Sequence, residues 1–236
     1  MSFTIRIPDA DFGDYFMNTG YPDGVDLVNL FVFGGGATLS AKNNAGGANA
    51  TIIGAPLYHP NYVTVDHLNF IETSNEISDN NSTLIIAVRH LTANHFSAGT
   101  YTEYSKPGTL LYCNFPTENT VSINGAVSIP PNPNLETGIQ SNAPVDSDFN
   151  FYAITQKAGT VTVYAIVNGV VTQSSMDVIS QHTGKVRFGG WSLVGVKNTH
   201  DIAMAGIYKK GLDAAQLEAF YTRAKVLLAG RGITLK

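Results

Sequence analysis

Residues 149–172 read FNFYAITQKAGTVTVYAIVNGVVT. The stretch holds two apolar segments, 149–156 and 160–167, which are rich in the β-branched and aromatic residues that favour strands. Short breaks, Lys157-Ala158-Gly159 and Asn168-Gly169, follow the two segments, and such Gly-containing breaks between apolar runs are typical of hairpins. We therefore predict a three-stranded antiparallel meander, with its third strand beginning at Val170.

Similar strand signals continue on both sides of the meander. They are Phe3–Ile7, Leu27–Phe33, Thr51–Pro56, Tyr62–Val65, Asn69–Thr73, Thr83–Arg89, Tyr101–Tyr104, Thr109–Phe115, Val121–Ile123, Val127–Ile129, Val186–Trp191 and His200–Tyr208. Thr83–Arg89 is almost continuously apolar, as expected of a strand that is covered on both faces. Asn124-Gly125 predicts a further hairpin turn, and Gly34-Gly35-Gly36 predicts a bend or bulge.

One helix is predicted, at the C-terminal end, over residues 213–229. Asp213 is a suitable N-cap, and Gln216 three residues later completes a capping-box pattern. The apolar positions at i, i+3, i+4, i+7 and i+11 define one face of this helix: Leu217, Phe220, Tyr221, Ala224 and Leu228. The sequence therefore predicts an all-β, two-sheet antiparallel sandwich on which one C-terminal helix packs.

The composition limits the possible classes of protein. Of the 236 residues, 44% are hydrophobic and 14% are charged, which is typical of short apolar strands joined by uncharged loops. The net charge of −4 and the lack of a Lys/Arg stripe argue against a nucleic-acid partner. No apolar run is long enough to span a bilayer, and residues 1–8 do not resemble a signal peptide. The single cysteine, Cys113, excludes an intrachain disulfide.

Two regions are distinguished along the chain. Residues 1–30 are interrupted by Pro and Gly and form a strand-and-loop segment that is a candidate assembly contact. Residues 31–236 form the sandwich with its helix. The segment Pro130-Pro131-Asn132-Pro133-Asn134 is not a domain boundary, because strands of the same character continue on both sides of it.

Three stretches together resemble the concanavalin A-like, laminin G-like jelly-roll superfamily. They are residues 44–56, with the lead-in Asn44-Ala45-Gly46-Gly47-Ala48-Asn49; residues 151–169, which end in Ile166-Val167-Asn168-Gly169; and residues 188–217, with Gly206-Ile207-Tyr208 and Gly211-Leu212-Asp213-Ala214-Ala215-Gln216-Leu217. The third stretch is the most specific, since it joins a strand, a loop and a capped helix in order. Lone jelly rolls of this kind are frequent among tail-associated proteins of tailed phages, which residues 1–30 loosely resemble.

The resemblance implies a jelly roll with a ligand site on a concave face or among edge loops. Members of this superfamily include lectins, glycosidases, adhesive modules and virion proteins, so that the fold alone does not decide the function.

The sequence gives little support for a glycoside hydrolase, because this class of enzyme needs two carboxyl groups at a set separation. The superfamily's glucanases carry an E-x-D-x-x-E strand, and no pair of glutamates here fits that pattern. Glu72 and Glu76 are expected to lie across a loop. Motifs of zinc proteases and of serine hydrolases are absent. Asp79 and Asn80 are weak candidates for Ca²⁺ ligands, because oxygen-rich loops suit that ion, although polar turns use the same residues.

Candidate ligand-binding residues are aromatic side chains with polar neighbours. Trp191 is the only tryptophan, and it has an equally good explanation as a residue at the edge of the core. Three further candidates, Tyr101, Tyr104 and Tyr112, serve equally well as ordinary sheet residues. Asn114 and His95 are candidate polar neighbours of these rings, although a solvated loop or strand end is the favoured explanation of the histidine.

Our hypothesis from the sequence is a non-enzymatic protein. It either recognises a surface glycan or serves as a structural or adhesive element of a bacteriophage tail or capsid, in contact with other virion subunits and as an oligomer. Its expected location is a virion or an extracellular surface, reached without a signal peptide. No cofactor is expected, and Ca²⁺ is left open as an alternative. The alternative is a glycoside hydrolase of the same fold class.

Overall fold

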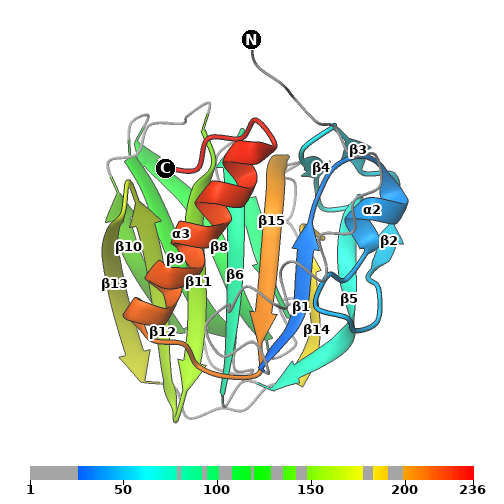
Figure 1. Ribbon diagram of the computed structural model, residues 1–236. Coiled ribbons are helices and arrows are strands. Elements are labelled where there is room, and N and C mark those ends of the chain that lie inside the picture. The colour runs from blue at the N-terminus through cyan, green and yellow to red at the C-terminus, as the bar shows by residue number, and fades with distance from the viewer. Residues whose placement is uncertain are drawn as a thin grey trace.

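The computed structural model describes residues 26–78, 81–91, 95–100, 108–117, 120–128, 135–141, 148–177, 183–190 and 199–236. Within them the chain forms two antiparallel β-sheets that face one another and a long C-terminal helix on the outside of one sheet (Figure 1). The two-sheet sandwich and its single C-terminal helix agree with the architecture predicted from the sequence.

The first sheet, called sheet A, has eight strands. In spatial order they are β13 (Val170–Asp177), β12 (Thr160–Val167), β11 (Asn150–Lys157), β6 (Asn81–His90), β15 (His200–Tyr208), β4 (Val63–Val65) and β3 (Leu57–Tyr58), and β1 (Leu27–Val32) also pairs with β15. The predicted meander is confirmed as β11–β12–β13. Its two turns use residues with positive φ: Ala158 and Gly159 in the first turn, and Asn168 and Gly169 in the second.

The second sheet, called sheet B, has seven strands. In spatial order they are β10 (Leu135–Ser141), β9 (Thr120–Ser128), β8 (Gly108–Thr117), β7 (His95–Gly99), β14 (Thr183–Phe188), β5 (Phe70–Ser78) and β2 (Thr51–Ile53). The hairpin predicted at Asn124-Gly125 is wrong, because β9 runs through both residues without a break. It pairs with β8 on one side and β10 on the other, and this ladder outweighs the turn preference of two residues.

The central strands of sheet A are covered on both faces, and two apolar cores result. One core fills the space between the sheets, where Ile86 and Tyr152 of sheet A meet Ile71 and Phe188 of sheet B. The other lies on the outer face of sheet A, under α3 (Ala214–Gly230). Every residue of β15 is buried, which confirms that central strands of this sheet are covered on both sides.

Helix α3 forms as the sequence predicts. The Asp213 carboxylate accepts the N–H of Gln216 at 2.9 Å, and the Gln216 side chain accepts the N–H of Asp213 at 3.0 Å, which completes the capping box. The five predicted apolar residues are the buried ones: Leu217, Phe220, Tyr221, Ala224 and Leu228. Gly232, with φ of 77°, follows the helix end.

The bend predicted at Gly34–Gly36 is confirmed, because the chain bends at Gly35 and Gly36. A short helix, α2 (Ala37–Ala41), follows this bend, and the sequence did not predict it. Gly34 needs to be glycine, since an added Cβ would lie 2.6 Å from the backbone N of Tyr62. Strand β1 begins at Leu27 and pairs with β15. The division of the chain at residue 30 and the proposed role of residues 1–30 in assembly stay predictions.

Candidate functional site

The strand directions bring several polar segments to one end of the sandwich. His200, at the start of β15, pairs with His90, at the end of β6, and with Val65, at the end of β4. Phe188 of β14 and Ile71 of β5 pair at the same end. The C-terminus of α3 also lies here, at the upper end in Figure 1. We call this end of the molecule the rim.

An ion pair on sheet A anchors the first polar group near the rim. Arg89, Asp201 and Thr64 form one row across the neighbouring strands β6, β15 and β4. Arg89 donates from Nε and Nη2 to Asp201 Oδ2 at 3.0 and 2.6 Å, and Thr64 Oγ1 donates to Oδ1 at 2.5 Å. The Asp201 side chain is 3% exposed and that of Arg89 is 22% exposed, so the row ties three strands together and the Arg89 side chain is partly exposed.

Aromatic rings flank the guanidinium of Arg89. Its carbon lies 4.8 Å from the ring centre of Tyr62 and 5.0 Å from that of Phe149. The imidazole of His59 stacks on Tyr62 at 4.2 Å, and its Nε2 lies 3.1 Å from Thr64 Oγ1. Burial lowers the pKa of Arg89, but hydrogen bonds with Asp201 and Tyr62 outweigh burial and raise the pKa, which keeps the group charged. We call these six residues the Arg89 cluster: His59, Tyr62, Thr64, Arg89, Phe149 and Asp201.

The Arg89 cluster has the features of a binding surface. The partly exposed rings of His59 and Tyr62 and a fixed cation offer stacking and hydrogen bonding to a polar ligand, whereas Phe149 is buried behind them. Its one carboxylate is engaged by Arg89 and Thr64, and its histidine is stacked on a tyrosine. These six side chains do not include the two opposed carboxyl groups that glycoside hydrolysis needs.

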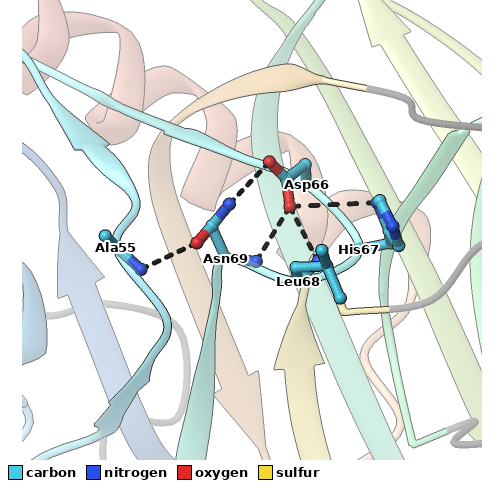
Figure 2. A network of polar contacts seen from close by, with 5 residues as sticks. All are labelled: Ala55, Asp66, His67, Leu68 and Asn69. Atoms are coloured by element: carbon cyan, nitrogen blue, oxygen red, sulfur yellow. Dashed lines mark hydrogen bonds and ion pairs between the residues drawn. The ribbon is translucent and has the colours of Figure 1, made fainter.

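A second polar group closes the turn between β4 and β5 (Figure 2). Asp66 Oδ1 accepts the N–H groups of Leu68 and Asn69 at 2.7 and 2.8 Å, and Oδ2 accepts the Asn69 amide at 2.8 Å. Asn69 Oδ1 accepts the N–H of Ala55 at 2.7 Å, which holds the loop after β2 against the turn. Burial alone would raise the pKa of Asp66; these hydrogen bonds and the nearby His67 outweigh burial and hold the pKa below its ordinary value.

This turn also contacts the segment that precedes Trp191. Gly190 donates its N–H to Asp66 O at 2.9 Å, and an added Cβ at Gly190 would lie 2.8 Å from the ring of Phe70. Both Gly189 and Gly190 have positive φ, at 81° and 86°. The close approach and the backbone conformation explain the glycine pair that the sequence places before Trp191.

The third feature at the rim is a pocket of about 300 Å³ beside the end of α3. Its lining residues are Lys225, Ala229, Gly232, Ile233, Thr234 and Leu235. The C-terminal segment that forms one wall is fixed to β11, because Phe149 donates its N–H to Thr234 O at 3.1 Å and Lys236 donates to Phe149 O at 2.9 Å. The pocket and the Arg89 cluster therefore share Phe149 as a neighbour.

Several residues proposed from the sequence lie outside the described part of the chain. They are the ligand-binding candidates Trp191, Tyr101 and Tyr104 and the metal candidates Asp79 and Asn80. Their proposed roles stay predictions. Among the described residues, no group of three or more His, Cys, Asp or Glu side chains is arranged to hold a metal ion.

The other three candidates lie on neighbouring strands of sheet B. His95 belongs to β7, and Tyr112 and Asn114 belong to β8. The register pairs His95 with Cys113, the residue between Tyr112 and Asn114 in the sequence. The backbone thus brings the three positions close together, and their proposed role in binding stays a prediction.

The glutamates that were considered for hydrolysis have a different setting from the expected one. Glu72 and Glu76 do not lie across a loop, because β5 continues through both. At roughly 3.3 Å per residue their Cα atoms are about 13 Å apart, beyond the 5–9.5 Å or so that separates the carboxyl groups of glycosidases. Glu72 also accepts a hydrogen bond from Arg187 Nε at 2.8 Å. The hydrogen bond between Glu72 and Arg187 joins β5 to β14 and so stabilises sheet B.

Sequence patterns did not single out the residues of the Arg89 cluster. Arg89 and Asp201 are 112 positions apart, and Thr64 and Asp201 are 137 apart. A short motif cannot reveal such a group, since strand pairing creates it. The one available signal was a charged residue at each of two strand ends, Arg89 after an apolar run and Asp201 before one.

No family model matches the sequence, and no curated protein matches it either. Solved structures do share the fold. The receptor-binding domain of botulinum neurotoxin type G is similar over 85% of this chain and 52% of its own, with a TM-score of 0.63 and 11% identity. The ligand-binding domain of serotype D, in complex with N-acetylneuraminic acid, is similar over 88% of this chain and 51% of its own, with a TM-score of 0.58 and 12% identity.

These likenesses define the class of the protein by its fold alone, a two-sheet β-sandwich that these two structures share. At sequence identities of 11% and 12%, the similarity shows a common fold and nothing about function. The chain spans about half the length of the domains it matches. Among the described residues, no helix is both long and apolar enough to cross a membrane.

Proposed function

We propose that this protein is a non-enzymatic carbohydrate-recognition protein whose ligand binds at the rim. The observation that carries the proposal is the Arg89 cluster, where stacked rings and a fixed ion pair lie beside a pocket. Rings stack against the C–H faces of sugars, and charged planar groups hydrogen-bond their hydroxyls, so that this combination suits a glycan.

The fold likenesses support the same function. The similar structures are receptor-binding domains, and one of them was solved with a bound sugar. The concanavalin A-like resemblance of the sequence, whose members include lectins, points in the same direction. We infer further that the glycan belongs to a bacterial surface and that the protein acts in adhesion on a phage particle, as the resemblance of residues 1–30 to tail proteins implies.

A structural role in a phage tail or capsid is the second candidate. It is favoured by large aliphatic side chains that are exposed, such as Leu39, Leu57 and Leu68, which are 56%, 62% and 63% exposed. Surfaces of this kind are suited to contacts with other subunits. This candidate expects an oligomer, and sedimentation of the purified protein tests it directly.

The decisive experiment is binding of the purified protein to a panel of bacterial surface polysaccharides, with and without Ca²⁺. We expect saturable binding to at least one glycan. A His59→Ala variant removes a ring from the Arg89 cluster, a Trp191→Ala variant removes the tryptophan, and Lys209→Gln is a control at an exposed position away from the rim. Loss in His59→Ala locates the ligand at the Arg89 cluster, and loss in Trp191→Ala locates it beyond Gly190. Absence of binding to every glycan would contradict the proposal and favour the structural role.

A further inference from the structure

The pocket beside α3 carries positive charge that no carboxylate among the described residues neutralises. Lys225 lines it, and Arg231 lies between Ala229 and Gly232, which also line it. Among the residues that the structure describes, neither cation forms an ion pair with a carboxylate. A third cation, Lys236, is paired with Asp148 at 3.2 Å. Two positive charges therefore have no carboxylate partner within the described part of the chain, in a protein whose net charge is −4.

The ammonium group of Lys225 has hydrogen-bond donors that no described residue accepts. Its ammonium group donates one hydrogen bond, to Tyr221 Oη at 3.2 Å, and lies 5.5 Å from the centre of that ring. An ammonium has three donors, so two are available to a ligand. The tyrosine fixes the ammonium group of this pocket-lining lysine.

Arg231, which precedes the lining residue Gly232, adds a second positive charge beside the pocket. Its Nη1 is buried without a hydrogen-bond partner, and its Nη2 lies 3.5 Å from Pro60 O, at the limit of a hydrogen bond. Burial lowers the pKa of this arginine, as expected of a cation withdrawn from water without a counter-ion. The C-terminus of a helix carries only about half a negative charge, too little to offset two cations. A nearby anion would relieve this unfavourable burial.

The size and the remaining lining of the pocket limit the ligand. A volume of about 300 Å³ is at the small end of ligand pockets. Ile233 and Leu235 are buried apolar residues, whereas Thr234 is exposed and offers a hydroxyl. The pocket thus suits a compact ligand with one charged group, one apolar side and hydroxyl groups.

We propose that this pocket binds the carboxylate or sulfate group of an acidic sugar, with the Lys225 ammonium as its direct partner and Arg231 as a second source of positive potential. The proposal deepens the function proposed above and rests on it, since it names the class of glycan that the rim selects.

The test uses a matched pair of probes, glucuronate and glucose, which differ in a carboxylate against a hydroxymethyl group. Galacturonate and galactose repeat the comparison for another sugar configuration. In ¹H–¹⁵N NMR titrations we expect saturable shifts of the Thr234 and Leu235 amides with the uronates and none with the neutral sugars. Added salt should weaken the binding, because exposed charges are screened.

Variants then show which positively charged side chain binds the uronate. Lys225→Gln should weaken uronate binding at least about tenfold, as the loss of a hydrogen bond to a charged group predicts, and Lys225→Arg should retain most of it. Arg231→Gln should weaken it to a smaller extent. Lys209→Gln removes an exposed lysine elsewhere and should have no effect. Lys225 is itself exposed, so its replacement should not unfold the protein.

The outcomes separate this inference from the proposed function. Binding of neutral polysaccharides together with an absence of uronate shifts at Thr234 would overturn the acidic-sugar pocket and leave glycan recognition intact. Equal uronate affinity in Lys225→Gln and the unmodified protein would also overturn it. Uronate binding that Lys225→Gln abolishes, without binding to any polysaccharide, would support the pocket and contradict the wider role in glycan recognition.

Discussion

At the scale of single residues, the partly buried Arg89 depends on Asp201 as its counter-ion. The carboxylate is almost fully buried, and both its oxygens accept hydrogen bonds from Arg89 or Thr64. Replacing Asp201 with alanine leaves a partly buried guanidinium without its counter-ion, which we expect to lower the free energy of unfolding by about 3 kcal/mol. Urea denaturation measures this loss. A change as small as that of the exposed control Lys209→Gln, within roughly 0.5 kcal/mol, would show that the pair does not stabilise the fold.

Asp66 predicts a dependence of stability on pH. Its pKa is lower in the folded protein than in the unfolded chain, so its ionised form favours folding. This stabilisation is complete above the unfolded pKa, about 3.9, and is lost as the pH falls through the lower folded pKa. Asp66→Asn should therefore destabilise the protein at pH 7, and the difference from the unmodified protein should shrink near pH 3. Urea midpoints at the two pH values decide this, and an unchanged difference would argue against the hydrogen bonds to ionised Asp66.

At the scale of single elements, α3 depends on its capping box. The Asp213 side chain satisfies the N–H of Gln216, which has no partner within the helix. Asp213→Ala should lower the free energy of unfolding by about 1 kcal/mol. Val226 lies on the same helix and is 73% exposed, so Val226→Ala is the matched control and should change stability by less than about 0.5 kcal/mol. Thermal unfolding of both variants makes the comparison, and equal effects would exclude a specific role for the cap.

The turn between β12 and β13 depends on backbone conformation. Gly169 has φ of 79° and open space around it, so an added methyl group meets no atom and acts through the backbone alone. Gly169→Ala should cost about 1 kcal/mol or somewhat more. Gly230, at the end of α3, has equally open space, and φ is not positive there. Gly230→Ala should therefore be neutral or stabilising by up to about 1 kcal/mol. Urea denaturation of the pair separates a backbone effect from an effect of the methyl group.

At the scale of the whole molecule, local features were predictable and long-range ones were not. The capping box, the apolar face of α3 and the β11–β12–β13 meander follow from residues close in the sequence. The Asn124-Gly125 prediction failed because pairing with β8 and β10 decides that segment. The Arg89 cluster escaped the sequence analysis for the same reason, as strand pairing between distant segments assembles it.

Sheet A contributes residues to both cores, and we therefore expect the two cores to unfold together. Phe188 fills the core between the sheets, where its ring lies 5.8 Å from that of Phe31, and Phe220 fills the outer core, with its ring 6.0 Å from Tyr208. Both cores include residues of β6, β11 and β15, so neither can come apart without loosening the same strands. Phe188→Ala and Phe220→Ala should each cost about 3–5 kcal/mol and shift one common transition.

Far-UV and near-UV circular dichroism, recorded during the same urea titration, measure that cooperativity. Coincident transitions are expected for the unmodified protein and for both variants, because a two-state protein gives the same midpoint with every probe. If Phe220→Ala instead produced a separate early transition in which helical signal was lost while the tyrosine signal of the sandwich persisted, α3 would be an independent unit. The rim pocket, whose walls come from α3 and the segment after it, would then open without unfolding of the sheets.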